Sequence, residues 1–160
     1  MTTTAIEKAL SILKREIKKW KVPVVGQFAK ESVDRPFATL ISCLLSLRTK
    51  DAVTEQATRR LFAVASTPQE IFGLETNQLE KLIYPVGFYR TKAKNLKETC
   101  NLLIKQHGAR VPGTMEELLA LPGVGRKTAN LVLTVGHDQY GICVDTHVHR
   151  ISNLWGYVKT

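Results

Sequence analysis

The sequence has 160 residues, with 23 Lys and Arg against 14 Asp and Glu and a formal net charge of +9 at pH 7. A charge of this sign favours a polyanionic partner, either a nucleic acid or an anionic membrane surface. No apolar run approaches the ~18 residues of a membrane span and residues 1–20 carry charge throughout, so we expect neither a spanning helix nor a signal peptide. We therefore expect a soluble cytoplasmic protein with no membrane partner, and with one sizeable core or a core plus part of a second lobe.

Helical patterns dominate the sequence in chain order. Residues 4–20 place apolar side chains every three or four positions with Lys and Arg opposite, which predicts an amphipathic helix. Residues 35–47 contain the apolar run FATLISCLLSL, which is too long for a typical strand and predicts a buried central helix. Asp51 is expected to cap a helix at 52–64. Further helices are expected at 68–72, 77–84 and 90–107, the last ended by Gly108.

The segment LPGVGRKTAN at 121–130 predicts a hairpin between two helices. Pro122 cannot continue a helix, and the glycines at 123 and 125 permit backbone conformations that a side chain forbids, so we expect helices at 115–120 and 124–136. Unpaired N–H groups at the start of the second helix would face outward past residues without a Cβ, which suits a phosphate oxygen. A plain turn between two helices is the alternative.

Lys127 lies in the first turn of this second helix, beside Arg126. The helix dipole and the neighbouring guanidinium both oppose the positive charge of Lys127. An amine with an ordinary pKa of about 10.4 needs such help to act as a nucleophile near neutral pH. The alternative for Lys127 is a solvated surface lysine.

Asp145 follows the apolar run at 142–144 and precedes a short helix expected at 146–154. An N-cap is the alternative to a ligand-facing role, and one carboxylate can fill both. His147 and His149 are two positions apart and face different directions on a helix, and no Cys or Glu completes a ligand set at suitable spacing. No catalytic metal is therefore expected.

LPGVGRKTAN followed by VDTHVHR resembles the endonuclease III branch of the helix-hairpin-helix DNA glycosylases, over a stretch from about residue 5 to the last residue. The resemblance implies base-excision repair by a bifunctional glycosylase and lyase, in which Lys127 attacks the deoxyribose C1′ and Asp145 assists. It implies double-stranded DNA with oxidised pyrimidines or abasic sites as the substrate, with thymine or uracil opposite guanine as an alternative, in a bacterial or archaeal cytoplasm. The hairpin residues expected to contact DNA are Leu121, Gly123, Val124, Gly125 and Arg126.

The resemblance also implies an all-α fold, with a six-helix barrel domain beside a second helical lobe. The barrel is expected at 26–143, with its helix-hairpin-helix at about 115–136, and part of the second lobe at 1–25 and 144–160. Only sixteen residues follow Val144, so the C-terminal part of this lobe is expected to be missing. A separate chain that completes the lobe is a candidate partner.

Relatives in this family commonly hold a four-iron cluster on four closely spaced cysteines. This sequence has only three cysteines, at positions 43, 100 and 143, and they are widely spaced. Neither their number nor their spacing supplies a cluster, so we expect no iron–sulfur cofactor in this chain. Disulfides are not expected either, because the cysteines are odd in number and lie in apolar or helical context.

Two further segments are expected to handle the damaged base, because a glycosylase takes its target nucleotide out of the stack and fills the gap with side chains. Arg48 in LLSLRTKD stands where many relatives have a glutamine that plugs this gap; a surface arginine on a phosphate or an acid is the alternative. VGFYRTKAKN resembles the family's other wedge loop, with Phe88 or Tyr89 available to intercalate or to pack in the core. This basic segment, including Arg90 and Lys92, is expected to contact phosphates.

Two readings compete with the enzyme. A non-catalytic or incomplete helix-hairpin-helix module would bind DNA through its phosphates and need a partner chain for chemistry. Retention of both Lys127 and Asp145 argues against this reading, and the short C-terminal lobe argues for it. A basic helical protein that binds an acidic protein would not require the hairpin and the lysine together, so it ranks last.

Overall fold

The computed structural model describes residues 3–20 and 23–160, and it contains helices and loops with no strand in these ranges. The all-α prediction is confirmed. The chain divides into two compact units, one made of Met1–Val22 with Val144–Thr160 and the other of Pro23–Cys143. Positions 1–2 and 21–22 of the lobe expected at 1–25 lie outside the described residues.

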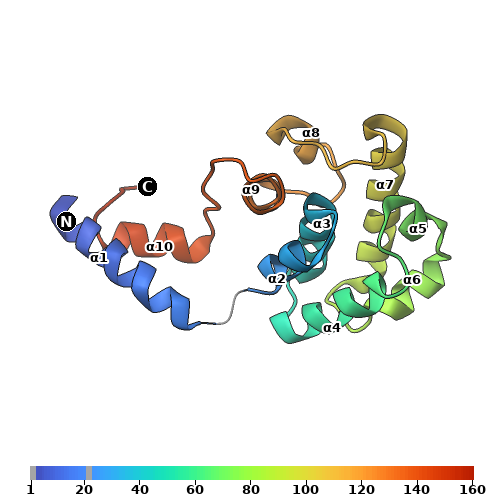
Figure 1. Cartoon of the computed structure of the whole chain (residues 1–160), viewed down its shortest axis with the longest axis horizontal. Coiled ribbons are helices and arrows are strands. Elements are labelled where there is room, and N and C mark those ends of the chain that lie inside the picture. The colour runs from blue at the N-terminus through green and yellow to red at the C-terminus, as the bar shows by residue number, and fades with distance from the viewer. Residues whose placement is uncertain (1–2, 21–22) are drawn as a thin grey trace. The chain divides into compact units, whose positions relative to one another are not determined.

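The larger unit is a set of helices joined by short loops. In chain order it contains α2 (Val24–Glu31), α3 (Arg35–Ser46), α4 (Asp51–Phe62), α5 (Pro68–Gly73), α6 (Thr76–Ile83), α7 (Tyr89–His107), α8 (Met115–Leu119), α9 (Arg126–Leu131) and the π-helical turn η2 (Val132–Gly136) (Figure 1). The sequence analysis did not predict α2, which begins directly after Pro23.

Helix α3 forms the centre of the larger unit. Its start is fixed by the Asp34 carboxylate, which accepts a hydrogen bond of 3.0 Å from the N–H of Phe37. The helix contacts α2, α4, α7, α9 and η2, so side chains on all of its faces are buried. Leu40, Ile41 and Leu45 are fully buried, and each stabilises the fold by roughly 1.5–3 kcal/mol relative to an exposed position. The predicted buried central helix is confirmed.

Helix α7 packs against α5 and α6, which lie beside it in Figure 1. It buries Leu96, Cys100 and Leu103 along one stripe. As predicted, it ends at Gly108, whose φ of 57° is left-handed and therefore favours a residue without a Cβ. The chain then reverses, and the N–H of Ala109 donates to the carbonyl O of Leu103 at 2.9 Å.

At two helix starts the cap or the turn differs from the prediction. Lys50, and not Asp51, is the N-cap of α4; Asp51 is the first helical residue, where its negative charge still suits the helix dipole. The second helix of the hairpin begins at Arg126, two residues later than expected. The reason is that Gly125 has an extended backbone, and the N–H of Val124 closes the turn on the carbonyl O of Leu121 at 3.1 Å.

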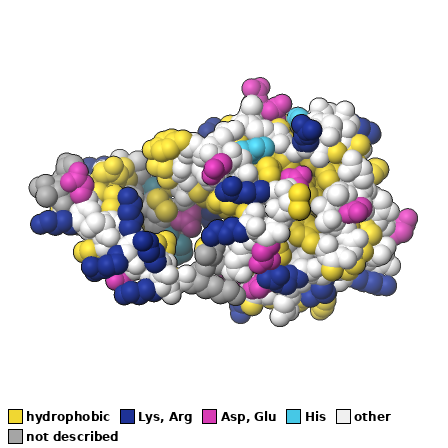
Figure 2. All heavy atoms as spheres, viewed as in Figure 1, with side chains coloured by type: hydrophobic (Ala, Val, Ile, Leu, Met, Phe, Trp, Pro, Cys, Tyr) yellow, Lys and Arg dark blue, Asp and Glu magenta, His cyan; other side chains and the backbone are white. Residues whose placement is uncertain are grey.

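The smaller unit contains α1 (Thr3–Glu16), the 3-10 turn η1 (Ile17–Lys19) and α10 (Thr146–Leu154). Figure 2 shows Lys and Arg side chains along α1. The expected apolar stripe of α1 is about half exposed, with exposed fractions of 48% for both Leu10 and Leu13. No side chain described in this unit is buried. No helix within the described ranges has the length and apolar character to cross a membrane.

Candidate active site and nucleic-acid interface

The predicted hairpin is formed by α8, the turn at 120–125 and α9. Thr114 caps α8, because its hydroxyl accepts from the N–H of Glu117 at 3.3 Å. Gly123 has a φ of 78°, and a Cβ there would lie 3.1 Å from the Nδ2 of Asn95. A Cβ on Gly125 would meet no atom within 4 Å. The turn is therefore closed against the core at Gly123 and open to the outside at Gly125.

The side chains of Leu121 and Val124 are core residues, with exposed fractions of 3% and 8%. They attach the turn to the hydrophobic core that includes Leu44 and Ala129. Because both side chains face inward, only the backbone of these two residues is available for the expected DNA contact. Arg126, by contrast, is exposed at the start of α9.

Lys127 is exposed in the first turn of α9 and lines a pocket of about 160 Å³. Arg48 lines the same pocket, so the structure brings together two residues that the sequence analysis assigned to separate tasks. The remaining lining residues come from the end of α3 and from α9: Cys43, Ser46, Leu47, Thr128 and Leu131. An amine and a guanidinium at one small pocket favour a ligand with negative charge or with carbonyl oxygens.

Cys43 is the only thiol in the lining of this pocket, and sequence analysis missed its position. Burial, and to a smaller extent Cys143, raise the pKa of the Cys43 thiol to about 12, although the charge of Lys127 lowers it. The thiolate form of Cys43 is therefore rare near neutral pH, which leaves Lys127 as the candidate nucleophile of the pocket. No signal in the sequence separated Cys43 from the other apolar residues of α3.

Asp145 is the N-cap of α10, as the alternative reading stated. Its Oδ1 accepts hydrogen bonds of 2.9 Å from the N–H groups of both His147 and Val148. These bonds explain why α10 begins at Thr146. The carboxylate is half-buried, and it belongs to the smaller unit, whereas Lys127 belongs to the larger one.

Arg48 and Phe88 have the same unusual backbone conformation. Their φ angles are 52° and 58°, in the left-handed region that residues with a Cβ rarely adopt. Each such residue costs about 1–3 kcal/mol and persists only where the surrounding structure determines it. The guanidinium carbon of Arg48 lies 5.7 Å from the centre of the Phe88 ring. The two expected wedge residues therefore form one unit on the surface.

The two aromatic residues of the expected wedge loop differ in their surroundings. Phe88 is 63% exposed. Tyr89 is half-buried, packs against the core cluster and makes an edge-to-face contact with Tyr84 at 5.4 Å between ring centres. Arg90 is exposed and lies over the Tyr89 ring at 5.4 Å. Phe88 is thus the outward aromatic, and Tyr89 fills the core position that the sequence analysis kept as the alternative.

Lys92 requires a correction, because a phosphate contact was expected from its charge. Its side chain is only 9% exposed, and its Nζ donates to the carbonyl oxygens of Leu45 at 2.7 Å and Leu47 at 2.6 Å and to the Oγ1 of Thr49 at 3.2 Å. Burial lowers the pKa of Lys92 to about 8. The ammonium group thus binds the end of α3 and the loop that follows it in place of a phosphate. The sequence held a signal, because position 92 lies four residues before Leu96 on the inward stripe of α7.

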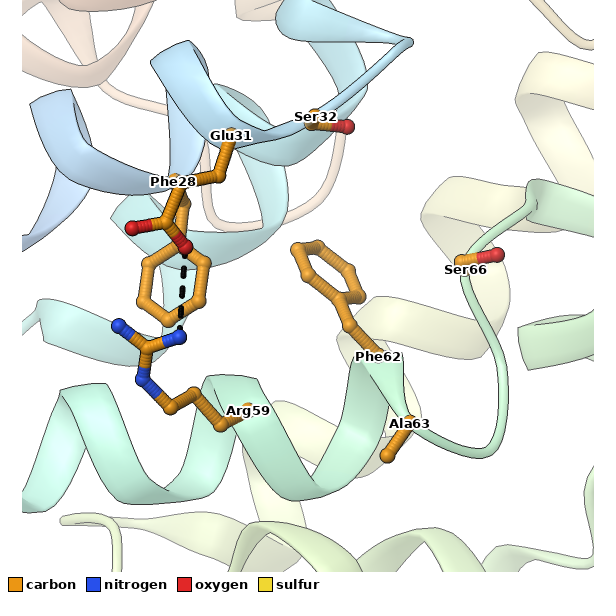
Figure 3. A pocket seen from close by; sticks show the side chains of 7 residues that line it. All are labelled: Phe28, Glu31, Ser32, Arg59, Phe62, Ala63 and Ser66. Atoms are coloured by element: carbon orange, nitrogen blue, oxygen red, sulfur yellow. Dashed lines mark hydrogen bonds and ion pairs between the residues drawn. The ribbon is translucent and has the colours of Figure 1, made fainter.

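A larger cavity of about 340 Å³ lies between α2 and α4 (Figure 3). Arg59 lies over the Phe28 ring at 5.2 Å and pairs with Glu31 at 3.3 Å. The cavity is lined by Phe28, Glu31, Ser32, Arg59, Phe62, Ala63 and Ser66. Its only cation is already paired and none of the predicted site residues lines it, so the pocket at Lys127 is the better candidate for chemistry.

Comparisons with known proteins agree with the geometry of the hairpin. Residues 41–160 match the family model described as HhH-GPD superfamily base excision DNA repair protein. Endonuclease III of Thermotoga maritima is 48% identical over 86% of this chain and 68% of that protein. A chloroplastic endonuclease III homolog 2 of Arabidopsis thaliana is 47% identical over 79% of this chain, which spans only 33% of that longer protein.

Two solved structures of endonuclease III with DNA also match the chain. A non-covalent endonuclease III–DNA complex matches with a TM-score of 0.85 at 33% identity, over 99% of this chain and 71% of that chain. A trapped endonuclease III–DNA covalent intermediate matches with a TM-score of 0.83 at 36% identity, over the same shares of the two chains.

Proposed function

Because the chain belongs to the HhH-GPD superfamily of base excision DNA repair proteins, in its endonuclease III branch, we propose that it is a bifunctional DNA glycosylase and abasic-site lyase. Its substrate is double-stranded DNA that contains an oxidised pyrimidine or an abasic site. The observation that carries the proposal is the position of Lys127, which is exposed at a small pocket that it shares with Arg48. A similar protein that was trapped as a covalent DNA intermediate supports chemistry by a nucleophile.

Lys127 is the proposed nucleophile. Its neutral amine attacks the deoxyribose C1′, the bond from C1′ to the base breaks, and the base leaves with the electron pair and gains a proton. Asp145 takes the proton from the amine or stabilises the positive charge that develops on the sugar. The sugar ring then opens to a Schiff base with Lys127. Loss of a C2′ proton breaks the C3′–O bond and cuts the strand 3′ to the site.

The hairpin and the wedge residues hold the DNA during this reaction. The open position at Gly125 lets a phosphate oxygen approach the backbone at the start of α9, while the buried Leu121 and Val124 keep the turn in place. Exposed Arg126 and Arg90 add charge for further phosphates. Arg48 and Phe88 fill the gap that the extruded nucleotide leaves.

We propose that this chain carries no iron–sulfur cluster. Cys43 and Cys100 are buried, and burial raises the pKa of both thiols to about 12, which opposes the thiolate form that iron requires. Among the described residues, no three His, Cys, Asp or Glu side chains gather at a spacing that could hold a metal ion. Iron and sulfide in stoichiometric amount in the purified protein would contradict this proposal.

We also propose that the protein is located in the cytoplasm.

A DNA-binding module that needs a partner chain for chemistry is the second candidate. The observation in its favour is the smaller unit, in which no described side chain is buried although Asp145 lies there. A separate chain that covers its apolar residues would complete the catalytic arrangement. This candidate predicts salt-sensitive DNA binding without covalent chemistry.

Borohydride trapping on a duplex with one abasic site separates the two candidates. The wild-type chain is compared with Lys127→Ala, and with Arg126→Ala as a neighbour that loses a charge but keeps the amine at 127. We expect a covalent adduct with the wild type and with Arg126→Ala, and none with Lys127→Ala, while Lys127→Ala still binds DNA. Binding by the wild type without any adduct would favour the module, and equal trapping by Lys127→Ala would remove Lys127 from its role.

A further inference from the structure

We propose that Lys92 and Thr49 form a clamp that holds the two wedge residues, Arg48 and Phe88, in the conformation that enters DNA. The inference rests on the proposed function, because it concerns residues that the proposal inserts into the base stack. Lys92 and Thr49 are positioning residues: they act through Arg48 and Phe88 and do not themselves contact the DNA.

The first half of the clamp binds the loop that carries Arg48. The Nζ of Lys92 reaches the carbonyl oxygens of Leu45 and Leu47 and the hydroxyl of Thr49, so its donors are directed at acceptors before and after Arg48. The hydroxyl of Thr49 in turn donates to the carbonyl O of Leu47 at 3.2 Å. The chain on both sides of Arg48 is thus tied to one buried ammonium group on α7.

The second half of the clamp binds the loop that carries Phe88. The N–H of Gly87 donates to the Oγ1 of Thr49 at 3.1 Å, although the two residues belong to different loops. The loops pack so closely that a Cβ on Gly87 would lie 2.6 Å from the carbonyl O of Arg48. The Thr49 hydroxyl therefore joins Lys92, the Arg48 loop and the Phe88 loop in one set of hydrogen bonds.

The clamp accounts for the left-handed backbone of both wedge residues. A residue with a Cβ leaves this conformation unless its neighbours oppose the change. The groups that flank Arg48 are held by Lys92 and Thr49, and the N–H of Gly87, the residue before Phe88, is held by Thr49. Without the clamp, the two side chains would lose their common orientation, and more ordering would have to occur when DNA binds.

The test follows the unstacking of a base and does not need chemistry at Lys127. The probe is a duplex with a stable tetrahydrofuran abasic analogue and 2-aminopurine beside it, and the fluorescence rise at saturating protein reports unstacking. The variants are Thr49→Val, which removes the hydroxyl at nearly constant shape, and Thr49→Ser, which keeps it. Lys92→Met removes the ammonium, and Lys30→Met removes the same charge from an exposed position on α2.

We expect Thr49→Val and Lys92→Met to lose most of the fluorescence rise, while Thr49→Ser and Lys30→Met keep it. In Thr49→Val and Lys92→Met, the base-excision rate at saturating DNA should fall by about one to two orders of magnitude, because the substrate is no longer held in the reactive position. The Michaelis constant should change less. In a protein with Arg48→Ala and Phe88→Ala, adding Thr49→Val should change neither quantity further.

Two results would overturn the clamp. One is an equal fluorescence rise with Thr49→Val and Thr49→Ser. The other is a full effect of Thr49→Val in the absence of the Arg48 and Phe88 side chains, which would indicate general damage to the fold. Failure of the proposed function is distinguishable, since it would leave the wild type without a trapped adduct or without a fluorescence rise.

Discussion

The guanidinium of Arg48 lies over the ring of Phe88, with 5.7 Å between its central carbon and the ring centre, although one residue follows α3 and the other precedes α7. Both residues have left-handed backbones, and both are exposed. An exposed cation–π pair contributes about 0.5–1 kcal/mol, which is less than the backbone strain of two such residues. The pair alone therefore does not hold these loops, and the buried contacts beneath it are needed.

The two hairpin glycines should respond differently to alanine. Gly123→Ala should lower the free energy of unfolding by about 1–2 kcal/mol, because its φ of 78° is left-handed and Asn95 is close. Gly125→Ala should change stability little, because its φ of −99° suits any residue and its surroundings are open. It should nevertheless weaken DNA binding, since the new Cβ would stand where we propose that a phosphate approaches.

Urea unfolding and DNA titration at several salt concentrations measure both effects of these alanines. Unchanged affinity in a well-folded Gly125→Ala protein would exclude the hairpin backbone as a phosphate site.

Asp145 offers a pair of substitutions that separates capping from catalysis. Asp145→Ala should lose the bonds to the N–H groups of His147 and Val148 and destabilise α10 by about 1 kcal/mol. Asp145→Asn keeps a good N-cap but removes the carboxylate. We expect Asp145→Asn to slow base excision more than it slows cleavage of a preformed abasic site. An equal loss of both rates would leave Asp145 with a structural role only.

The buried Lys92 should make stability depend on pH. Its pKa is lowered from 10.5 to about 8 in the folded chain, so between these values the unfolded chain binds more protons and stability rises with pH. This contribution is fully present above pH 10.5 and is lost as the pH falls through 8. The unfolding free energy of the wild type minus that of Lys92→Met should therefore become more positive from pH 8 to 10. A constant or shrinking difference in urea titrations would contradict the lowered pKa.

The three thiols should differ in their reaction with iodoacetamide. At pH 8, a thiol with a pKa of about 12 is ionised in roughly one molecule in ten thousand, so Cys43 and Cys100 should remain unmodified in the native protein. Cys143 is half-buried and should react first. Mass spectrometry of peptides from timed samples gives the order of labelling. Early labelling of Cys43 would contradict the burial of its thiol.

The fold could be predicted from the sequence where the local pattern and the packing agree. The apolar run of α3 is long and is followed by a turn, and Gly108 ends α7 as its backbone requires. Helix α2 was missed because eight residues with an internal glycine give a weak periodic signal, and its position depends on packing against α3. The prediction at Asp51 was wrong by one residue, since capping depends on backbone angles that the sequence only biases.

Single residues of the site could be predicted from the sequence, but the contacts between them could not. The hairpin and Lys127 could be identified because glycines and a following lysine make a local pattern. The pocket that Lys127 shares with Arg48 depends on two segments far apart in the sequence. Lys92 was misassigned because a lysine on a basic helix is usually solvated, whereas its position on the inward stripe of α7 favoured burial.

Helix α3 buries side chains on all of its faces, and Cys43 and Ser46 on the same helix line the pocket at Lys127. The size of the pocket can therefore change through a residue that is 97% hidden from solvent, since Cys43 is only 3% exposed. A larger side chain at 43 would narrow the pocket and a smaller one would widen it, with no change in the exposed side chains that line it. We therefore expect that substitutions at position 43 can alter what the pocket admits while the exposed Lys127 and Arg48 at its rim stay unchanged.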